Sequence, residues 1–136
     1  MDFMRSIAIA ASGLRAQAGR MRVIAENIAN ADSTAPSSGA EPYRRKIATF
    51  KTEVDRALDA RIVTLGPVRT DPSEFRIKHE PGHPNADENG NVRYPNVNAL
   101  VEMTDMREAQ RSYEANINII GASRRMIQRT IEILRS

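Results

Sequence analysis

The chain has 136 residues and a formal net charge of +3, which is enough for one domain with a modest core. Three Phe, three Tyr and no Trp leave few of the side chains that dominate compact cores, which favours assembly with other chains. The lack of cysteine excludes a disulfide framework and thiol catalysis. The longest apolar run near the N-terminus, Ile7–Ala11, is too short to span a membrane.

Residues 1–32 are predicted to form an N-terminal helix with a heptad repeat of apolar residues. One column of the repeat is mostly alanine, and the other consists of large aliphatic side chains. The 3-4 spacing places a narrow apolar stripe on one helix face, as in a coiled-coil seam. The columns are Met4, Ala11, Ala18, Ala25 and Ile7, Leu14, Met21, Ile28.

The same N-terminal residues resemble a secretory signal peptide in outline. Arg5, a short apolar stretch and Ala16-Gln17-Ala18 mimic its three regions. Ser12-Gly13 interrupts the apolar stretch, however, and Arg15 precedes the supposed cleavage site. Because the heptad also runs through that site, we expect the N-terminus to be retained if the protein leaves the cytoplasm.

The middle segment, residues 33–95, has no heptad and is predicted to contain a small β element. Residues 33–42 form a turn-rich loop, and Tyr43–Lys51 is predicted to be extended. A short helix over Phe50–Leu58 is the alternative, since Phe50, Val54, Ala57 and Leu58 have helical spacing. Both interpretations stay open from the sequence.

Two further strands and a hairpin are predicted in the second part of the middle segment. Arg61–Leu65 is a strand that ends at Gly66-Pro67, and the alternation around Ile77 predicts a half-buried strand over residues 75–79. Asn89-Gly90 is typical of a two-residue hairpin turn, with Val92–Tyr94 as the returning strand.

Residues 96–136 are predicted to form a long C-terminal helix that Asn96 or Asn98 caps. Gly121 lies inside this helix and favours the close approach of another helix. Gln110 and Arg124 interrupt the heptad where apolar residues would maximise stability, and such polar residues can specify register and partner number. The columns are Met103, Gln110, Ile117, Arg124, Ile131 and Met106, Tyr113, Ile120, Ile127, Leu134.

No residue pattern supports catalysis or a cofactor. His79 and His83 flank Pro81-Gly82 without further ligands at regular spacing, so a zinc site is not expected. The pairs Glu102 with Asp105 and Asp105 with Glu108 are interpreted as solvated charges on one helix face. We therefore expect a protein that is not an enzyme and has no catalytic, cofactor-binding or metal-binding residues.

The predicted fold is mainly α and elongated. It has two long terminal helices in a coiled-coil-like pair, a middle segment with a small β-hairpin, and one structural unit overall. A stand-alone coiled-coil scaffold or a nucleic-acid-binding protein is the alternative, because the first helix is basic and amphipathic. A helix bundle with many salt bridges explains both helices with fewer assumptions, and we expect no nucleic acid, small-molecule substrate or membrane insertion.

The terminal motifs resemble those of the bacterial flagellar rod and hook proteins. The residues that carry the resemblance are Ala11-Ser12-Gly13-Leu14, Asn27-Ile28-Ala29-Asn30-Ala31-Asp32 and Arg111-Ser112-Tyr113-Glu114-Ala115-Asn116. In the middle segment, Tyr43-Arg44, Glu80-Pro81-Gly82-His83-Pro84 and Pro95-Asn96-Val97 narrow the resemblance to the proximal rod proteins of that family.

The resemblance implies a structural subunit of the basal body that transmits torque for motility in the periplasmic rod. It implies unprocessed export through the flagellar type III apparatus. It also implies as neighbours copies of itself, the proximal rod proteins FlgB and FlgF, the adaptor FliE and the distal rod. The residues expected to build the seam with these partners are Ala11, Leu14, Ala18, Met21, Ile28, Met106, Tyr113, Ile117, Ile120, Ile127, Ile131 and Leu134.

Overall fold

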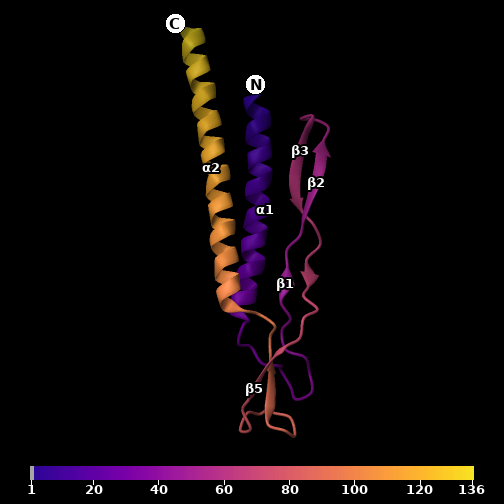
Figure 1. Ribbon diagram of the computed structural model, residues 1–136. Helices are drawn as coiled ribbons and strands as arrows, with labels where there is room; N and C mark the ends of the chain where they lie inside the picture. Colours follow the sequence, from indigo (N-terminus) through magenta and orange to yellow (C-terminus); the bar gives the residue numbers. More distant parts are fainter. Residues whose placement is uncertain (1) are drawn as a thin grey trace. The chain divides into compact units, whose positions relative to one another are not determined.

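The computed structural model describes residues 2–136 and has a helix at each end of the chain (Figure 1). Helix α1 spans Phe3–Ala29 and α2 spans Ala99–Arg135, and short antiparallel strand pairs lie between them in the sequence. This order of elements confirms the prediction of two terminal helices around a middle segment with β structure. The strands are β1 (Lys46–Ile47), β2 (Phe50–Asp55), β3 (Ala60–Leu65), β4 (Arg69–Thr70), β5 (Arg76–His79) and β6 (Asn91–Tyr94).

The chain divides into two compact units, and each helix contributes to both. Unit 1 contains the chain up to Met21, Ala48–Pro67 and Arg107–Ser136, whereas unit 2 contains Arg22–Ile47 and Val68–Met106.

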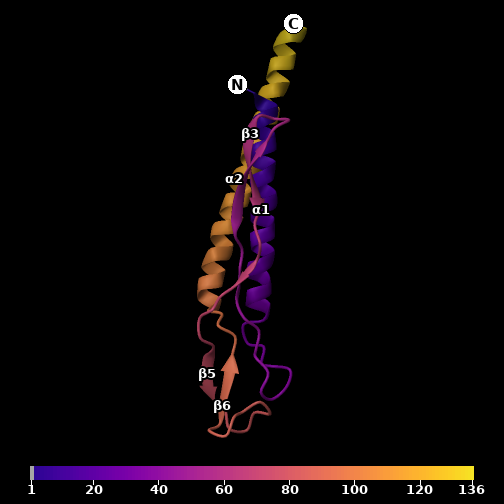
Figure 2. The same ribbon diagram turned by 90° about the vertical axis from the view of Figure 1, so that its right-hand side faces the viewer.

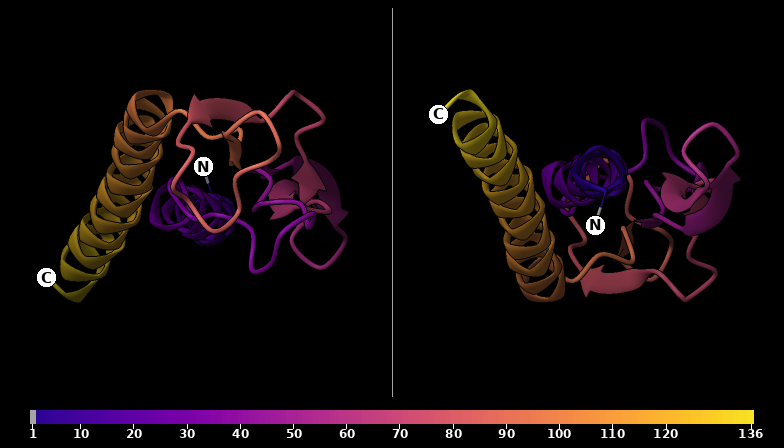
Figure 3. Two further views of the ribbon diagram at one scale, coloured as in Figure 1. Left: turned by 90° about the horizontal axis from the view of Figure 1, so that it is seen from below. Right: turned by 90° about the horizontal axis from the view of Figure 1, so that it is seen from above.

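In unit 1, α1 lies between α2 and the β2–β3 hairpin (Figures 1 and 3). Two glycines of α1 permit these contacts. A Cβ atom on Gly13 would lie 2.9 Å from the Asn116 side chain of α2, and one on Gly19 would lie 2.0 Å from Leu65 Cδ1 of β3. A larger residue at either position would force the Asn116 or Leu65 side chain to move.

The pairing of strand β2 shows which of the two interpretations of residues 50–58 is correct. All six of its residues pair with β3, from Phe50 opposite Leu65 to Asp55 opposite Ala60, so the helical alternative is wrong. Asp55 ends the strand, because its carboxylate accepts hydrogen bonds from the amides of Ala57 and Leu58. Phe50 and Val54 lie in the strand, whereas Ala57 and Leu58 lie in the turn that follows it, so their helical spacing does not come from a helix.

Unit 2 combines the end of α1 and the start of α2 with two strand pairs, β1–β4 and β5–β6. Figure 2 shows β5 and β6 side by side. Strand β6 carries the buried side of its pair, because Val92 and Tyr94 are buried together with the following Pro95 and Val97. Together with Val23, Ile24 and Ala31, these four residues belong to the apolar core of unit 2.

The β5–β6 pair differs from the prediction in two respects. Asn89-Gly90 is not a two-residue hairpin turn, because His79 pairs with Asn91 and all the residues between them form the connection. Asp87 stabilises the turn, because its carboxylate accepts hydrogen bonds from the Asn89 and Asn91 amides. Ile77 is exposed, so β5 is not the half-buried strand that its alternation predicts.

Side chains cap the N-terminal ends of both helices. Asn98 is the cap of α2, because its Oδ1 accepts hydrogen bonds from the amides of Leu100 and Val101. Asp2 has the same role for α1, with Oδ1 3.0 Å from the Met4 amide. Neither helix of the described chain has an apolar stretch long enough to cross a membrane.

Candidate assembly surface and its polar core

The predicted seam residues of α1 are all half-buried in the structure. This holds for Ala11, Leu14, Ala18, Met21 and Ile28. The deeply buried column of the helix lies one residue earlier in the repeat and contains Ala10, Ile24 and, just past the helix, Ala31. Contacts within the chain therefore use a face adjacent to the predicted seam and leave the seam partly open.

In α2 the two predicted columns differ in their exposure. Met106, Tyr113, Ile120 and Ile127 are half-buried, whereas Ile117, Ile131 and Leu134 are 45%, 50% and 80% exposed. The face that the chain buries again lies one residue before the exposed column, and its fully buried members are Glu102, Ala109 and Ser123. The exposed column has no partner within the described chain.

Further apolar side chains of α2 are exposed on another side of the helix. Ile119, Met126 and Ile133 each follow a position of the predicted column by two residues, so they lie nearly opposite it, and every residue from 128 to the C-terminus is exposed. Most apolar side chains of a water-soluble helix cover a core on one face. We name the exposed apolar residues of α2 in unit 1 the α2 outer face; its members are Ile117, Ile119, Met126, Ile131, Ile133 and Leu134.

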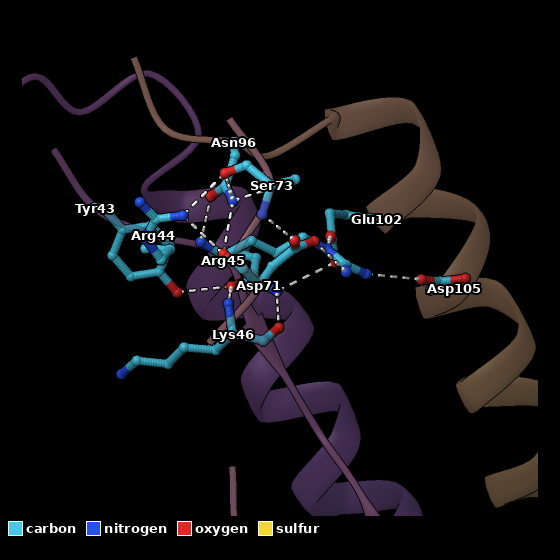
Figure 4. Close-up of polar contacts among 10 residues, drawn as sticks. Tyr43, Arg44, Arg45, Lys46, Asp71, Ser73, Asn96, Glu102 and Asp105 are labelled. Carbon is cyan, nitrogen blue, oxygen red and sulfur yellow. Dashed lines mark hydrogen bonds and ion pairs between the residues drawn. The ribbon is translucent and has the colours of Figure 1, made fainter. Parts of the chain in front are cut away.

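Charged and polar side chains form the inner core of unit 2 (Figure 4). Glu102, in the first turn of α2, is 1% exposed and accepts a hydrogen bond from Arg45 Nε. The same guanidinium lies 3.3 Å from Asp71 and 3.7 Å from Asp105. A buried carboxylate needs a paired and hydrogen-bonded cation, and Arg45 provides one by facing three carboxylates.

Asn27 connects this cluster to α1. Its amide nitrogen donates to the Lys46 carbonyl at 2.8 Å and to Glu102 Oε2 at 3.4 Å. Its Oδ1 accepts hydrogen bonds from the Tyr43 hydroxyl at 2.7 Å and from the Lys46 amide at 2.9 Å. The side chain thus makes all four hydrogen bonds that an asparagine can form, and it holds β1 against the end of α1.

The environment of the cluster shifts the pKa of Tyr43 and the pKa of Asp71 away from their ordinary values. Burial, and then the charges of Glu26 and Glu102, raise the pKa of Tyr43 to about 12. Hydrogen bonds from Ser73, and then the Arg45 guanidinium, lower the pKa of Asp71. Both shifts preserve the state that the network needs, because Tyr43 stays a donor and Asp71 stays an anion.

The interpretation of Glu102 as a solvated charge is wrong, and the sequence analysis missed this cluster. Its members come from distant parts of the chain, so no local spacing identifies them. One signal was available: Glu102 shares a heptad column with Ala109, Asn116 and Ser123, and this column of small or polar residues is the one that faces the rest of the chain.

Within residues 2–136, no other helix approaches Gly121, so its predicted role in helix packing stays a prediction for contacts with other chains. Among the described residues, a Cβ built on Gly121 has a neighbour within 4 Å only in Arg125 of the same helix, at 3.4 Å. The close approach between α1 and α2 uses Gly13 instead. Gly121 therefore leaves an open place on α2.

The two histidines make only local hydrogen bonds. His79 Nδ1 lies 3.3 Å from Asn91 Oδ1, and His83 Nδ1 accepts a hydrogen bond from the Asn85 amide at 3.0 Å. Within residues 2–136, no group of three or more His, Cys, Asp and Glu side chains is arranged to hold a metal ion.

Comparison with known proteins identifies the family of this chain. Residues 7–35 match the family described as "Flagella basal body rod protein", and residues 88–133 match the "Flagellar basal body rod FlgEFG protein C-terminal" family. The flagellar basal-body rod protein FlgC of Agrobacterium fabrum is 47% identical over 94% of this chain and 92% of its own length. The FlgC proteins of Aquifex aeolicus and Yersinia enterocolitica are 36% and 35% identical, over 97% and 98% of both chains.

This chain belongs to the FlgC family of flagellar basal-body rod proteins. It is a structural subunit of the rod in the basal body, and it is not an enzyme. The two matched segments contain all twelve predicted seam residues except Leu134, which follows directly after the second.

Proposed function

We propose that this FlgC-family subunit polymerises through its terminal helices and that the twelve predicted seam residues make the contacts. In α1 the contacting side chains are the half-buried ones that internal packing leaves partly open. In α2 they are three members of the α2 outer face and four half-buried residues: Ile117, Ile131 and Leu134, with Met106, Tyr113, Ile120 and Ile127. Residues 1–32 and 96–136 build the rod in this proposal, residues 33–95 distinguish this subunit from other rod proteins, and the three segments work as one structural unit.

The observation that carries the proposal is the exposure of the α2 outer face. Burial of apolar area is favourable by about 25 cal/mol per Å², so a helix that leaves six large apolar side chains in water has a strong tendency to associate. A coiled-coil-like pairing with helices of neighbouring subunits would cover these side chains. Gln110 and Arg124 lie in the exposed column and would then set register between subunits.

The proposed location is the proximal rod in the periplasm, reached through the flagellar type III export apparatus without cleavage of a signal peptide. The proposed neighbours are further copies of this chain, FlgB, FlgF, FliE and the distal rod. In this position the subunit transmits torque as part of the drive shaft. The near full-length similarity to FlgC proteins supports the proposal.

The test compares two substitutions that place the same charge on adjacent residues of α2. Ile117→Asp introduces a carboxylate into the proposed seam, whereas Asn118→Asp introduces one at an exposed polar position. An unpaired buried charge is costly, so Ile117→Asp is expected to abolish incorporation into basal bodies and motility. Asn118→Asp is expected to preserve both.

Incorporation is measured by immunoblotting purified basal bodies for the tagged subunit, with export of each variant measured separately. Because Ile117 is exposed, its substitution leaves the fold of the free subunit intact. Normal incorporation of the Ile117→Asp subunit would exclude the seam as the assembly surface.

A further inference from the structure

Strand β2 has a free edge in unit 1. The Gly66 amide donates to the Thr49 carbonyl at 2.8 Å, so these two residues form a hydrogen-bonded pair of the β2–β3 ladder. In an antiparallel ladder such pairs alternate, which turns the backbone groups of Phe50, Thr52 and Val54 away from β3.

The edge of β3 that faces away from β2 is hydrogen-bonded to α1, and the position of this bond agrees with the alternation. The backbone amide of Val63, opposite Thr52 in the register, points away from β2 and donates to the Ser12 hydroxyl of α1 at 3.2 Å. The hairpin therefore meets α1 with one edge. On the other edge, no group within residues 2–136 bonds to the backbone of Phe50, Thr52 or Val54.

The five residues along the free edge are complementary to themselves. When two copies of Phe50-Lys51-Thr52-Glu53-Val54 align antiparallel about Thr52, Phe50 lies opposite Val54 and Lys51 lies opposite Glu53, each pair occurring twice. The outward backbone groups then face their counterparts in hydrogen-bonded pairs. Phe50 and Val54 are 44% and 61% exposed in the single chain, so pairing covers apolar surface that is now in water.

We propose that free subunits pair through β2 with a second copy of this chain, as an antiparallel two-fold dimer. Three matched features fix the register: the outward backbone groups, the apolar pairs and the opposite charges. Opposite charges directly across from each other stabilise antiparallel strands, and like charges destabilise them. A parallel alignment in register would instead place Lys51 against Lys51 and Glu53 against Glu53.

The dimer is closed, because a two-fold interface uses the same surface on both copies and does not propagate. It therefore concerns the subunit before assembly. Its effect is to cover an exposed strand edge, which otherwise is a template for aggregation. The pairing does not use the helix seam, so the dimer and the proposed rod interface can be tested independently.

The test uses charge reversal on the purified full chain, with association measured by sedimentation equilibrium. The small contact predicts weak dimerisation of the wild type, with a Kd on the order of 0.1 mM. Lys51→Glu and Glu53→Lys each replace two attractive pairs by two repulsive ones, and each is expected to weaken dimerisation about tenfold.

Two combinations restore the complementarity and serve as matched controls. The double variant with both Lys51→Glu and Glu53→Lys again places opposite charges across the interface and is expected to dimerise like the wild type. An equimolar mixture of the two single variants is expected to form heterodimers, whereas each alone stays largely monomeric. If the charges act only within one hairpin, the double variant still restores association, because it keeps opposite charges on its own strand, but the mixture does not; failure of the mixture would therefore contradict the pairing.

Thr52→Pro tests the backbone contribution. The Thr52 amide points away from β3, so proline there removes a dimer hydrogen bond without removing a ladder bond. This variant is expected to be monomeric and to retain its circular dichroism spectrum. A wild-type chain that stays monomeric at ~1 mM, or a dimer that persists in the single charge variants or is lost in Ile117→Asp, would overturn the proposal.

Discussion

The two ends of α2 reverse the usual distribution of side chains. In the first turn, within unit 2, the fully buried residue is Glu102, and its contacts are charged or polar. In the last turns, within unit 1, Ile131, Ile133 and Leu134 are exposed. Soluble proteins ordinarily bury their large apolar residues and leave carboxylates outside.

This difference indicates two purposes within one helix. Hydrogen bonds are directional, so the network of Arg45, Asn27 and Glu102 fixes how α2 begins relative to α1 within unit 2. Apolar contacts are not directional, and in the proposed function the C-terminal turns make theirs with neighbouring subunits. The predictions below test this division, and the largest expected effect comes first.

Removal of the buried carboxylate is expected to have the largest effect. Glu102→Ala leaves Arg45 without its main partner in the core of unit 2 and is expected to lower the free energy of unfolding by about 3 kcal/mol. Urea denaturation of the full chain measures the change. Asp105→Ala is the control, because Asp105 faces the same guanidinium at 3.7 Å but is partly exposed; its loss is expected to cost under about 1 kcal/mol. Equal losses for both variants would contradict the special role of the buried carboxylate.

A second prediction concerns the close approach in unit 1. A methyl group on Gly19 would collide with Leu65, at a cost of about 2 kcal/mol, while alanine improves helix propensity by about 1 kcal/mol. Gly19→Ala is therefore expected to destabilise the wild type by about 1 kcal/mol. In a Leu65→Ala background the collision disappears, and the same substitution is expected to stabilise the chain by about 1 kcal/mol. Thermal unfolding of the four proteins checks this reversal of sign.

Tyr43 gives a test of the polar cluster that depends on pH. Its pKa is raised from 10.0 to about 12, chiefly by burial, so the unfolded chain ionises before the folded one. The stability contributed by Tyr43 is complete below pH 10 and is lost as the pH rises from 10 to about 12. Tyr43→Phe is expected to cost about 1 kcal/mol at neutral pH through the lost bond to Asn27. Its stability should also fall less steeply in the alkaline range, as denaturation curves at several pH values would show.

The smallest expected effect on stability belongs to the α2 outer face. Ile131→Ser changes a side chain that is 50% exposed, and the free energy of unfolding of the isolated subunit should change by less than about 0.5 kcal/mol. The same variant is expected to reduce incorporation into basal bodies. A large loss of stability in the isolated chain would instead show that Ile131 belongs to the internal core.

Periodicity and capping explain what was predictable from the sequence. The heptads identify both helices, Asn98 identifies where α2 begins, and Gly66-Pro67 identifies the end of β3. These features are local, since each depends on residues a few positions apart. The exposure of Ile117 and Leu134 was not fixed by the heptad, because a periodic stripe indicates a contact face and does not say which chain covers it.

The remaining features depend on contacts between distant residues. Residues 50–58 were ambiguous until β3 provided a partner for β2, since pairing decides the conformation of a short apolar segment. Asn27, Arg45 and Glu102 each look like ordinary surface residues in their own segments. Only their juxtaposition makes them a buried network, and sequence spacing carries no information about it.

The bond between Asn27 and Glu102 joins residues that are 75 positions apart in the chain. Closing so long a loop has a large entropic cost, and proteins that depend on such contacts fold slowly. The β2–β3 hairpin closes over a short turn and can form early, whereas unit 2 must wait for the start of α2. The two units therefore differ in how local their contacts are: the hairpin of unit 1 depends on neighbouring residues, and the polar cluster of unit 2 depends on residues from both helices.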